Sequence, residues 1–385
     1  MREKVCIGDL GTIITGKTPS KTNKSYYGNY VAFIKPTDIS EDSKFTYETE
    51  EMYSKLAAEK YKSSLIPKGA ICIPCIGTIG TKMTMTHCAC YTNQSINTII
   101  CNENYDNEYV YYLMKNFLPN LKSYNLGTAS GREFISKSNF EKIEIVAEQN
   151  KNIQKEIGKF LSRYDSLIEN YQKQIKLLEE SAQRLYKEWF IDLRFPGHEN
   201  TKIVNGVPEG WVKKTLDSFC NVFTGKKNAN QGVSNGKYKF FTCGDTPLLI
   251  NSYIYDGPAI IISGNGSYTG RTTFYKGKFD LYQRTYACVM KDMQDENLIY
   301  GLFEIVKCEL TNKISGGTHG AAIPYIVMSD VTKFDFLYEE NIMQRFSSIM
   351  HNILSESLSL LNQIRHLTEA RDRLLPKLMS GEIEV

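Results

Sequence analysis

The chain lacks the sequence features of membrane and exported proteins. No apolar run in its 385 residues approaches the roughly 20 residues that a membrane-spanning helix needs. The first twelve residues, MREKVCIGDLGT, lack the apolar core of a secretion signal. We therefore expect a cytoplasmic protein that does not contact a membrane.

The sequence is also poor in residues arranged for catalysis. Its five histidines, at positions 87, 198, 319, 351 and 366, match no hydrolase or metal-binding pattern. No Asn-Pro-Pro-Tyr-like segment for transferring a methyl group to a base is present. We therefore expect a protein with no catalytic residues and no active site of its own.

A large excess of charge of one sign is missing as well. The 46 basic and 43 acidic residues leave a net charge of +3. This near-balance neither requires nor excludes a nucleic-acid partner. Any affinity for DNA would have to come from local basic patches, because the whole molecule provides no strong positive field.

The ten cysteines do not indicate a disulfide framework, because the chain is large and carries no export signal. The tightest group, Cys72, Cys75, Cys88 and Cys90, has a spacing that could hold zinc. The alternative is that Cys72, which lies between two isoleucines, is a small apolar residue on a buried strand. We favour this alternative and expect no metal site.

What the sequence does contain is a tandem repeat with a period of about 190 residues. Each match is weak, but all occur in the same order. The matched pairs are Thr15-Gly16-Lys17 with Thr224-Gly225-Lys226, Phe33–Asp38 with Phe240–Asp245, Gly69–Ile73 with Gly257–Ile261, Gly77–Gly80 with Gly264–Gly270, Asn93–Ser95 with Tyr282–Arg284, Gly127-Thr128 with Gly317-Thr318, and Lys142–Ile145 with Lys333–Phe336. This alignment places Ile260 and Ser263 at the positions of Cys72 and Cys75, so the shared fold does not need a metal there.

Each copy predicts a mixed α/β (α+β) globular domain followed by a long helix. Short β-branched and aromatic runs, such as Tyr30–Ile34, Thr98–Cys101 and Ala259–Ser263, are bounded by turn residues and predict strands. The first long helix is expected from about Glu148 to Trp189, where Gly158 is the single glycine and no proline occurs.

Both predicted helices carry an apolar seam with steps of three and four residues, which is typical of a coiled coil. The first seam runs through Ile153, Ile157, Phe160, Tyr164, Leu167, Tyr171, Ile175, Leu178, Ala182, Leu185 and Trp189. The second runs through Ile342, Phe346, Ile349, Ile353, Leu360, Ile364, Leu367 and Leu374, until Pro376 disturbs the helix. We expect the helices to pair antiparallel and to separate the two globular domains by roughly 60 Å.

These patterns predict five segments along the chain. They are a first globular domain at 1–146, the first long helix at 147–193, a linker at 194–211, a second globular domain at 212–337, and the second long helix with the C-terminal tail at 338–385.

One motif suggests a different function. Gly11–Thr18 matches the nucleotide-binding P-loop pattern G-x-x-x-x-G-K-[ST]. A P-loop needs a buried strand before it and a helix after it, whereas Pro19 and a polar loop follow here. The second copy lacks the first glycine and the Ser/Thr. We therefore interpret the motif as a basic turn, and a stand-alone nucleotide-dependent enzyme remains the alternative that it would support.

The whole chain resembles the specificity subunits of type I restriction-modification systems. The segments that carry the resemblance are LYKEWFIDLRFPG at 185–197, GVPEGW at 206–211 and RDRLLPKLMSGEI at 371–383. The resemblance implies that each globular domain reads one half of a split target in double-stranded DNA. It further implies that the helices set the gap between the halves and bind two methyltransferase subunits. In the family those partners hold S-adenosylmethionine and methylate adenine, and a motor-nuclease subunit is an optional further partner.

Because target domains vary widely within this family, the resemblance assigns no DNA-contacting residue. The candidates below rest on residue type and on their position in basic or glycine-rich turns. The phosphate candidates are Lys17, Lys21, Lys24, Arg132, Lys137, Lys226 and Lys227. The base-reading candidates are Ser130, Arg132, Asn265, Ser267, Tyr268, Arg271, Arg284 and His319. For each, a plain solvated surface residue is the alternative.

Trp189, Phe190 and Phe195 allow two interpretations. We favour a core role at the end of the first helix, and the alternative is an interface for the methyltransferase. For the chain as a whole, the main rival to DNA recognition is a coiled-coil scaffold with two domains that bind something other than DNA. Salt dependence separates these two functions, since phosphate binding weakens steeply as salt rises.

Overall fold

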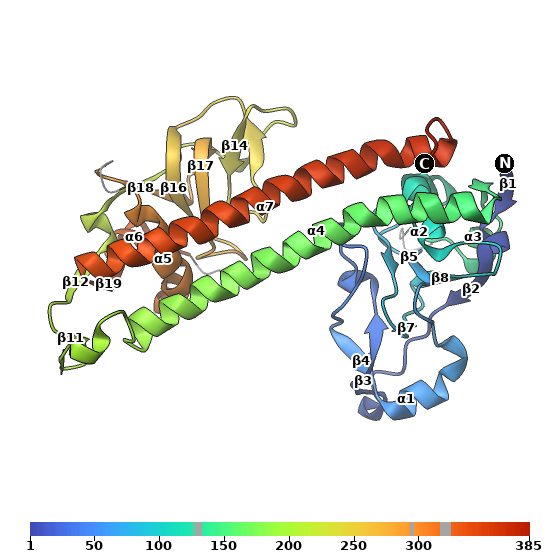
Figure 1. Ribbon diagram of the computed structural model, residues 1–385, viewed down its shortest axis with the longest axis horizontal. Helices are drawn as coiled ribbons and strands as arrows, with labels where there is room; N and C mark the ends of the chain where they lie inside the picture. Colours follow the sequence, from blue (N-terminus) through green and yellow to red (C-terminus); the bar gives the residue numbers. More distant parts are fainter. Residues whose placement is uncertain (126, 128–132, 293–295, 316–324) are drawn as a thin grey trace. The chain divides into compact units, whose positions relative to one another are not determined.

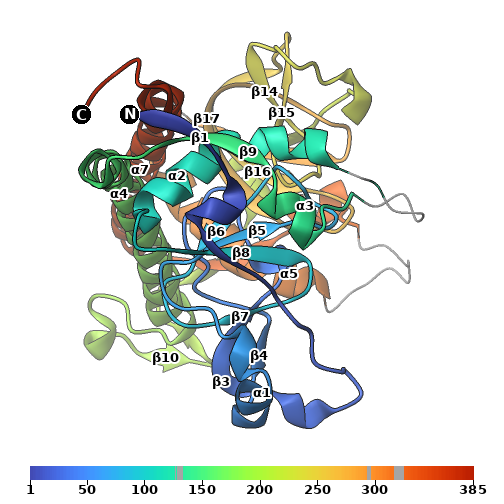
Figure 2. The same ribbon diagram turned by 90° about the vertical axis from the view of Figure 1, so that its right-hand side faces the viewer.

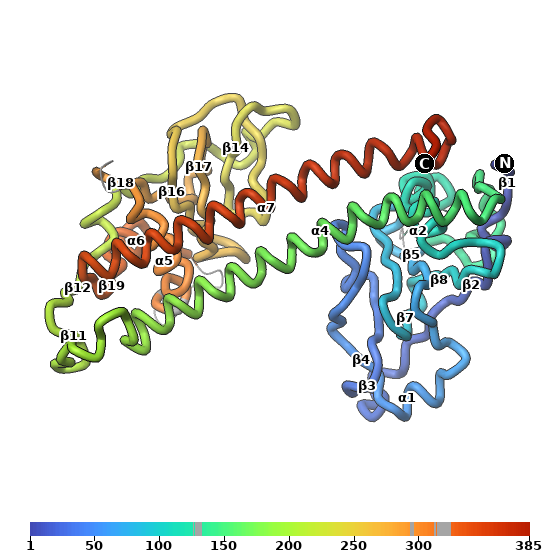
Figure 3. The backbone as a smooth tube through the Cα atoms, in the orientation of Figure 1, coloured from blue at the N-terminus to red at the C-terminus, as the bar shows by residue number. Residues whose placement is uncertain are grey.

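The computed structural model describes residues 1–125, 127, 133–292, 296–315 and 325–385. The chain divides into two compact units. Unit 1 comprises Met1–Gln172 and Leu361–Val385, and unit 2 comprises Lys173–Leu360. Two long helices, α4 (Lys151–Tyr186) and α7 (Glu340–Ser380), therefore contribute a segment to each unit. They are drawn in green and red in Figure 1, and the tube in Figure 3 follows the backbone through them.

Unit 1 contains a mixed domain with three small sheets. Its strands are β1 (Arg2–Cys6), β2 (Gly11–Thr15), β3 (Tyr27–Ile34), β4 (Glu51–Tyr53), β5 (Ile71–Pro74), β6 (Thr84–Met85), β7 (Tyr91–Thr92), β8 (Ile96–Cys101) and β9 (Glu144–Glu148), and its short helices are α1 (Lys55–Lys60), α2 (Asn107–Phe117) and α3 (Lys137–Glu141). The strand orders are β2-β8-β5-β6, β4-β3-β7 and β1-β9. Figure 2 shows β3, β4 and α1 at the end of this unit that lies away from α4.

Unit 2 repeats this plan with a larger sheet. Its strands are β10 (Ile203–Val204), β11 (Val207–Pro208), β12 (Val212–Thr215), β13 (Cys220–Thr224), β14 (Tyr238–Phe241), β15 (Leu248–Ile250), β16 (Tyr255–Ser263), β17 (Thr272–Leu281), β18 (Thr285–Met290) and β19 (Asp335–Tyr338), and its shorter helices are α5 (Leu298–Ser315) and α6 (Met328–Thr332). The six-stranded sheet has the order β13-β18-β16-β17-β14-β15, and β12 pairs with β19.

The predicted duplication is visible in the strand pairing. The order β2-β8-β5 in unit 1 corresponds to β13-β18-β16 in unit 2, and the antiparallel pair β1–β9 corresponds to β12–β19. Parallel pairing of β3 with β7 corresponds to parallel pairing of β14 with β17. The copies differ because β17 is one ten-residue strand, whereas unit 1 has two separate two-residue strands, β6 and β7. The continuous strand β17 joins β14 and β15 to the sheet of β13, β18 and β16, whereas unit 1 has two separate sheets at the corresponding place.

The strand register corrects the sequence alignment. Ile73 of β5 lies opposite Asn97 of β8, and Ile262 of β16 lies opposite Tyr286 of β18. On the other side of these strands, Asn97 lies opposite Thr15 and Tyr286 lies opposite Thr224. Thr15 and Thr224 are the threonines of the two Thr-Gly-Lys sequences. Ile73 therefore matches Ile262, whereas the sequence alignment paired it with Ile261.

With this register, Cys72 and Cys75 correspond to other residues of unit 2 than in the sequence alignment. Cys72 matches Ile261 and Cys75 matches Gly264, each one residue later than the sequence alignment gave. Three consecutive isoleucines in β16 made the register ambiguous, because a one-residue slip exchanges one apolar side chain for another. Neither Ile261 nor Gly264 has a metal-binding side chain, so the fold shared by the two copies does not need a metal at these positions.

Each unit has a core made from one sheet face, one helix and both long helices. In unit 1, Ile71 and Ile73 of β5 are fully buried in one cluster with α2, with Leu161 of α4 and with Leu375 of α7. In unit 2, Ile260 and Ile262 of β16 occupy the same role with α5, with the end of α4 and with the start of α7. Burial of these side chains is the main stabilising contribution in each unit.

The two helix segments run antiparallel within each unit, as predicted (Figure 1). The start of α4 packs near the end of α7 in unit 1, where Asp165 contacts Arg371. The end of α4 and the π-helical turn Lys187–Ile191 that continues it pack on the start of α7 in unit 2. There the rings of Trp189 and Phe190 lie 5.9 and 5.0 Å from the ring of Phe346.

The predicted apolar seam is wrong at three positions. Ile153, Leu167 and Ile349 are exposed by 41%, 43% and 38%. In unit 1, α4 turns Leu161 and Asp165 toward the globular domain instead. The predicted seam assumes that each long helix contacts only the other long helix. In the structure both helices also pack on the core of a globular domain, so the buried face of each helix differs from the predicted seam.

The sequence predicts that Pro376 disturbs the second helix, whereas α7 continues through Pro376 to Ser380. Leu378 and Met379 of its last turn are buried in the core of unit 1. Arg2 donates hydrogen bonds to the carbonyl oxygens of both residues, at 3.0 and 2.9 Å. These tertiary contacts offset the local cost of a proline inside a helix.

Candidate nucleic-acid interface

The Thr-Gly-Lys sequence of unit 1 forms a tight turn at the end of β2. Gly16 passes so close to β7 that a Cβ atom there would lie 2.1 Å from the carbonyl oxygen of Thr92. The backbone N–H of Lys17 donates to the same oxygen at 3.0 Å. The hydroxyl of Tyr53 donates to the carbonyl of Lys17 at 2.6 Å. The turn is thus held in place from two sides, and the Lys17 side chain is exposed.

This geometry is not that of a P-loop. The first glycine of the motif, Gly11, is itself the first residue of strand β2. The next element is a three-residue 3-10 turn, Lys24–Tyr26. A P-loop instead places its glycines between the strand and the N-terminus of a following helix, which then faces the phosphates. The interpretation of this segment as a basic turn agrees with the structure.

The second Gly-Lys turn has the same construction in unit 2. A Cβ atom on Gly225 would lie 1.8 Å from the carbonyl oxygen of Leu281, so only glycine fits at this crossing. The Lys226 side chain is exposed. The ammonium group of Lys227 lies 3.9 Å from the carboxylate of Asp280, which is 3% exposed. The two neighbouring lysines therefore have different surroundings.

The glycine-rich turn of unit 2 connects β16 to β17, as its sequence predicts. Gly266 has a φ of +82°, a conformation that favours glycine. The side chains of Ser267 and Tyr268 are exposed. Arg271 stacks over the Tyr268 ring at 4.6 Å and forms an ion pair with Asp245 at 2.7 Å. This ion pair fixes the turn against the β14–β15 loop.

The β17–β18 turn lies beside the glycine-rich turn. The backbone N–H of Gly264 donates to the carbonyl of Arg284 at 2.8 Å, and the Arg284 side chain is exposed. Asn265, next to Gly264, is half-buried. The structure thus brings together five base-reading candidates of unit 2, namely Asn265, Ser267, Tyr268, Arg271 and Arg284.

The remaining candidates fall into two groups. Ser130, Arg132 and His319 lie outside the described residues. The other three, Lys21, Lys24 and Lys137, are exposed. Lys21 and Lys24 follow the Gly16 turn, and Lys137 begins α3 and lies 3.6 Å from the carboxylate of Glu141.

Two exposed turn residues were missed in the sequence. Gln94 in unit 1 and Gln283 in unit 2 lie at the corner of equivalent turns, next to the two Gly-Lys turns. The repeat alignment already paired the segments that contain them. The sequence feature that could have identified them is that this glutamine is identical in the two copies, whereas the residues on either side of it differ.

Pairs of lysine and tyrosine near β3 and β14 were missed as well. In unit 1 the Lys60 ammonium lies 4.5 Å from the centre of the Tyr26 ring, and Lys55 lies 5.6 Å from Tyr30. In unit 2 the Lys278 ammonium lies 4.7 Å from the Tyr253 ring. Such pairs place a cation and an aromatic face on one surface, which suits contact with nucleic acid. Because these residues are far apart in the sequence, only the fold shows the pairing.

The aromatic residues at the end of α4 lie in the core of unit 2. Trp189 and Phe190 are each 8% exposed, and Phe195 is 4% exposed. The rings of Phe190 and Phe195 lie 5.6 and 4.8 Å from the ring of Trp211. These contacts give all three residues a packing role within this chain.

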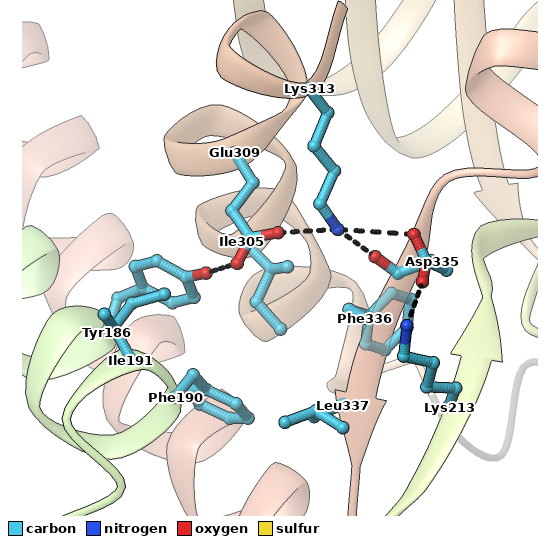
Figure 4. A pocket seen from close by; sticks show the side chains of 10 residues that line it. All are labelled: Tyr186, Phe190, Ile191, Lys213, Ile305, Glu309, Lys313, Asp335, Phe336 and Leu337. Carbon is cyan, nitrogen blue, oxygen red and sulfur yellow. Dashed lines mark hydrogen bonds and ion pairs between the residues drawn. The ribbon is translucent and has the colours of Figure 1, made fainter. Parts of the chain in front are cut away.

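A pocket of about 230 Å³ opens beside this aromatic cluster in unit 2 (Figure 4). A chain of polar contacts crosses it. The hydroxyl of Tyr186 donates to Glu309, and Lys313 lies 2.8 Å from Glu309 and 3.4 Å from Asp335. Lys213 lies 3.2 Å from Asp335. Burial raises the pKa of the Asp335 carboxyl, but these two lysines outweigh it and hold that pKa below its usual range. The charges therefore neutralise one another within the pocket.

All ten cysteines are free thiols, and the buried ones are Cys72, Cys75, Cys90, Cys220 and Cys288. Cys72 and Cys75 are 0% and 2% exposed, and burial raises the pKa of both thiols to about 12. Within the described ranges, no three His, Cys, Asp or Glu side chains are grouped as metal ligands. Over the same ranges, no helix has both the length and the apolar character needed to cross a bilayer.

Similarity to known proteins extends over most of the chain. A family model described as the type I restriction modification DNA specificity domain matches residues 2–180 and 208–349. The two matched regions begin at β1 and β11 and end within α4 and α7, so each covers one copy of the repeat.

Two relatives illustrate the range of similarity. The type I restriction enzyme MjaIX specificity subunit of Methanocaldococcus jannaschii is 28% identical over 414 aligned residues, which cover 98% of this chain and 93% of the relative. The type I restriction enzyme HindI specificity subunit of Haemophilus influenzae is 34% identical over 180 residues, which cover 46% of this chain and 38% of the relative.

The fold also matches a solved structure. The crystal structure of the type I restriction-modification system S subunit from M. genitalium aligns with a TM-score of 0.63 and 16% identity. The alignment covers 98% of this chain and 96% of that one. At this identity the comparison establishes a shared fold.

Proposed function

Because this chain belongs to the type I restriction modification DNA specificity family, we propose that it selects a bipartite DNA target for adenine methyltransferase subunits. The family is one of DNA recognition domains, and the relatives named above are specificity subunits, which are not catalytic. In this proposal each globular domain reads one half of the target, and the chemistry takes place on partner subunits.

The observation that carries the proposal is the internal duplication. Both units repeat the same strand order, and in both the Gly-Lys turn lies next to the turn that precedes the last long strand. Two similar surfaces in one chain suit two separate contacts with one duplex. The side chains in the other turns differ between the copies, so the two half-targets are expected to differ in sequence.

The proposed DNA surface of each unit consists of its exposed turns. Phosphate contacts are assigned to Lys17, Lys21 and Lys24 in unit 1 and to Lys226 in unit 2, because these side chains are exposed near the Gly-Lys turns. Lys137 and Lys227 remain weaker candidates, since each lies near a carboxylate. Phosphate contacts would fix the position of the duplex, and they do not discriminate sequence.

Base reading in unit 2 is assigned to the residues gathered around the glycine-rich turn. They are Asn265, Ser267, Tyr268, Arg271 and Arg284. Arginine recognises guanine in the major groove, and asparagine recognises adenine. Arg271 would have to exchange its ion pair with Asp245 for such a contact, whereas Arg284 is already exposed.

The proposed partners are two methyltransferase subunits, which would hold S-adenosylmethionine, and in some assemblies a motor-nuclease subunit. We assign their contact to exposed apolar residues of the long helices. Ile191, which follows the buried Phe190 and lines the pocket in Figure 4, is 53% exposed. The segments 1–146, 147–193, 194–211, 212–337 and 338–385 remain the proposed division into readers, spacers and linker.

The decisive experiment compares cells that contain a methyltransferase subunit with and without this chain. Methylome sequencing should reveal methylated adenines in one split motif that disappears when this chain is removed. Methylation that persists unchanged without the chain, or that lacks a split motif, would contradict the proposal.

A further inference from the structure

The same four-residue turn occurs at the same place in both units. In unit 1 the N–H of Ile96 donates to the carbonyl of Asn93 at 3.2 Å. In unit 2 the N–H of Thr285 donates to the carbonyl of Tyr282 at 2.9 Å. Each turn precedes a strand whose first residue is buried, β8 or β18. The second residue of the turn is an exposed glutamine in both copies, and it is the one identical residue among the four.

Each glutamine-bearing turn packs against the Gly-Lys turn of its own unit. In unit 1 the hydroxyl of Thr18, next to Lys17, donates a hydrogen bond to the side-chain oxygen of Gln94. In unit 2 the backbone N–H of Gln283 donates to the carbonyl of Lys227 at 3.0 Å. Thr224, at the start of the Gly-Lys turn, also donates its hydroxyl proton to the Gln283 carbonyl, at 2.8 Å. In each unit, the turn that carries an exposed glutamine therefore contacts the Gly-Lys turn that carries an exposed lysine.

A rigid support holds both sites. The glycine of each Gly-Lys turn, Gly16 or Gly225, has no room for a side chain because the neighbouring backbone fills the space. The strands beneath the turns carry fully buried residues such as Ile96 and Thr285. Such support keeps polar groups in position before a ligand arrives.

Residues that are identical in two readers cannot by themselves account for a difference in what the readers recognise. The neighbours of the glutamines do differ, since Asn93 and Ser95 in unit 1 correspond to Tyr282 and Arg284 in unit 2. The identical set is therefore suited to the feature that every stretch of duplex shares, which is its phosphate backbone.

We propose that Gln94 with Lys17, and Gln283 with Lys226, form a duplicated clamp for a DNA phosphodiester group. The glutamine NH2 group donates a hydrogen bond to a phosphate oxygen, and the lysine supplies the charge. The residues around each clamp then reach the base edges. This inference rests on the proposed function, because it assumes that both units bind DNA.

The test uses the full chain in complex with its methyltransferase subunit. The probe is a duplex that carries the motif found by methylome sequencing, together with duplexes changed at single bases in each half. Dissociation constants are measured over a range of salt concentrations for Gln94→Ala, Gln283→Ala, Lys17→Ala and Lys226→Ala. Gln183→Ala, which removes an exposed glutamine of α4, and Lys202→Ala, which removes an exposed lysine of the hairpin region, are the matched controls.

The clamp predicts that each glutamine variant weakens binding by about 5-fold for every duplex, the loss of one hydrogen bond. The order of preference among the duplexes should stay unchanged. The salt dependence should also stay unchanged for the glutamine variants, whereas each lysine variant should lower its slope by about one. The two controls should bind as the unaltered complex does.

Two results would overturn the clamp. A glutamine variant that alters base preference in one half of the target would make that glutamine a base reader. A glutamine variant that binds as tightly as the unaltered complex would show that the residue makes no contact. If instead the unaltered complex does not prefer its motif to an unrelated duplex, the proposed function itself is wrong. Thermal unfolding of each variant separates loss of contact from loss of fold.

Discussion

Arg371 in α7 forms an ion pair with Asp165 in α4, and each of the two residues is only 7% exposed. The hydroxyl of Tyr112 donates a hydrogen bond to the second carboxylate oxygen of Asp165. The helices α2, α4 and α7 thus meet at one buried ion pair within unit 1. In unit 2 the same helix positions carry Ala182 and Leu354, so the second copy solves the same packing problem without charge.

Replacement of the arginine alone is expected to destabilise unit 1 strongly. Arg371→Leu leaves the Asp165 carboxylate buried without its cation, which typically costs about 3–5 kcal/mol. Urea unfolding followed by circular dichroism measures this loss. The double variant Asp165→Leu/Arg371→Leu should recover most of it, because it copies the apolar solution of unit 2. A double variant as unstable as the single one would mean that the ion pair itself is the stabilising feature.

The two adjacent lysines of unit 2 should respond differently to substitution. Lys226→Ala removes an exposed charge, so it should reduce the salt dependence of DNA binding by about one unit of slope and leave unfolding unchanged. Lys227→Ala removes the cation beside buried Asp280, which keeps its hydrogen bonds from the Ser252 hydroxyl and the Leu281 N–H. This variant should lower the free energy of unfolding by about 1–2 kcal/mol. Anisotropy titrations and thermal unfolding measure the two effects. Equal behaviour of the two variants would contradict the assignment.

Glu304 in α5 provides a test based on pH. Burial raises the pKa of its carboxyl above the ordinary value of 4.5, although Lys307 and the Cys308 thiol lower it in part. The folded protein therefore binds this proton more tightly than the unfolded chain does, so ionisation of Glu304 costs stability as pH rises above about 4.5. Glu304→Gln should stabilise unit 2 near neutral pH and have little effect near pH 4. A gain that is equal at both pH values would show that the carboxyl has no shifted pKa.

The role of the long helices as a spacer can be tested by lengthening both. Insertion of seven residues after Gln172 in α4 and after Leu360 in α7, at the borders of the two units, adds about 10.5 Å and preserves the heptad pattern. This length corresponds to about three base-pair steps of about 3.4 Å. Methylome sequencing should show the same two half-motifs with a longer gap. Half-motifs that change in sequence while the gap stays constant would exclude the spacer role.

The sequence predicted the features that depend on repetition and periodicity. The tandem copies, the two long helices and the strands β3, β8 and β16 all correspond to structural elements. Periodicity cannot show which neighbour a helix contacts, so Leu167 was placed in a seam although it is exposed. Local propensity likewise could not show that Arg2 and the core of unit 1 hold the last turn of α7 in place after Pro376.

The candidate DNA surface was predicted less completely than the fold. The glycine and the lysine of Thr15-Gly16-Lys17 predict a basic turn. The structure shows why glycine is needed in this turn, because the backbone of Gly16 passes close to the carbonyl oxygen of Thr92. The pairing of Lys60 with Tyr26 depends on segments that only the fold brings together. The repeat pairs Gln94 with Gln283, but one identical residue among weak matches does not show that both lie in exposed turns beside the Gly-Lys turns.

The antiparallel pairs β1–β9 and β12–β19 place the entrance and the exit of each globular domain next to each other. Arg2 lies opposite Glu148 at the first pair, and Val212 lies opposite Tyr338 at the second. A foreign domain with its own ends equally close could replace either one while α4 and α7 keep their positions. Under the proposed function, such an exchange of one domain would change one half of the target and leave the rest of the chain as it is.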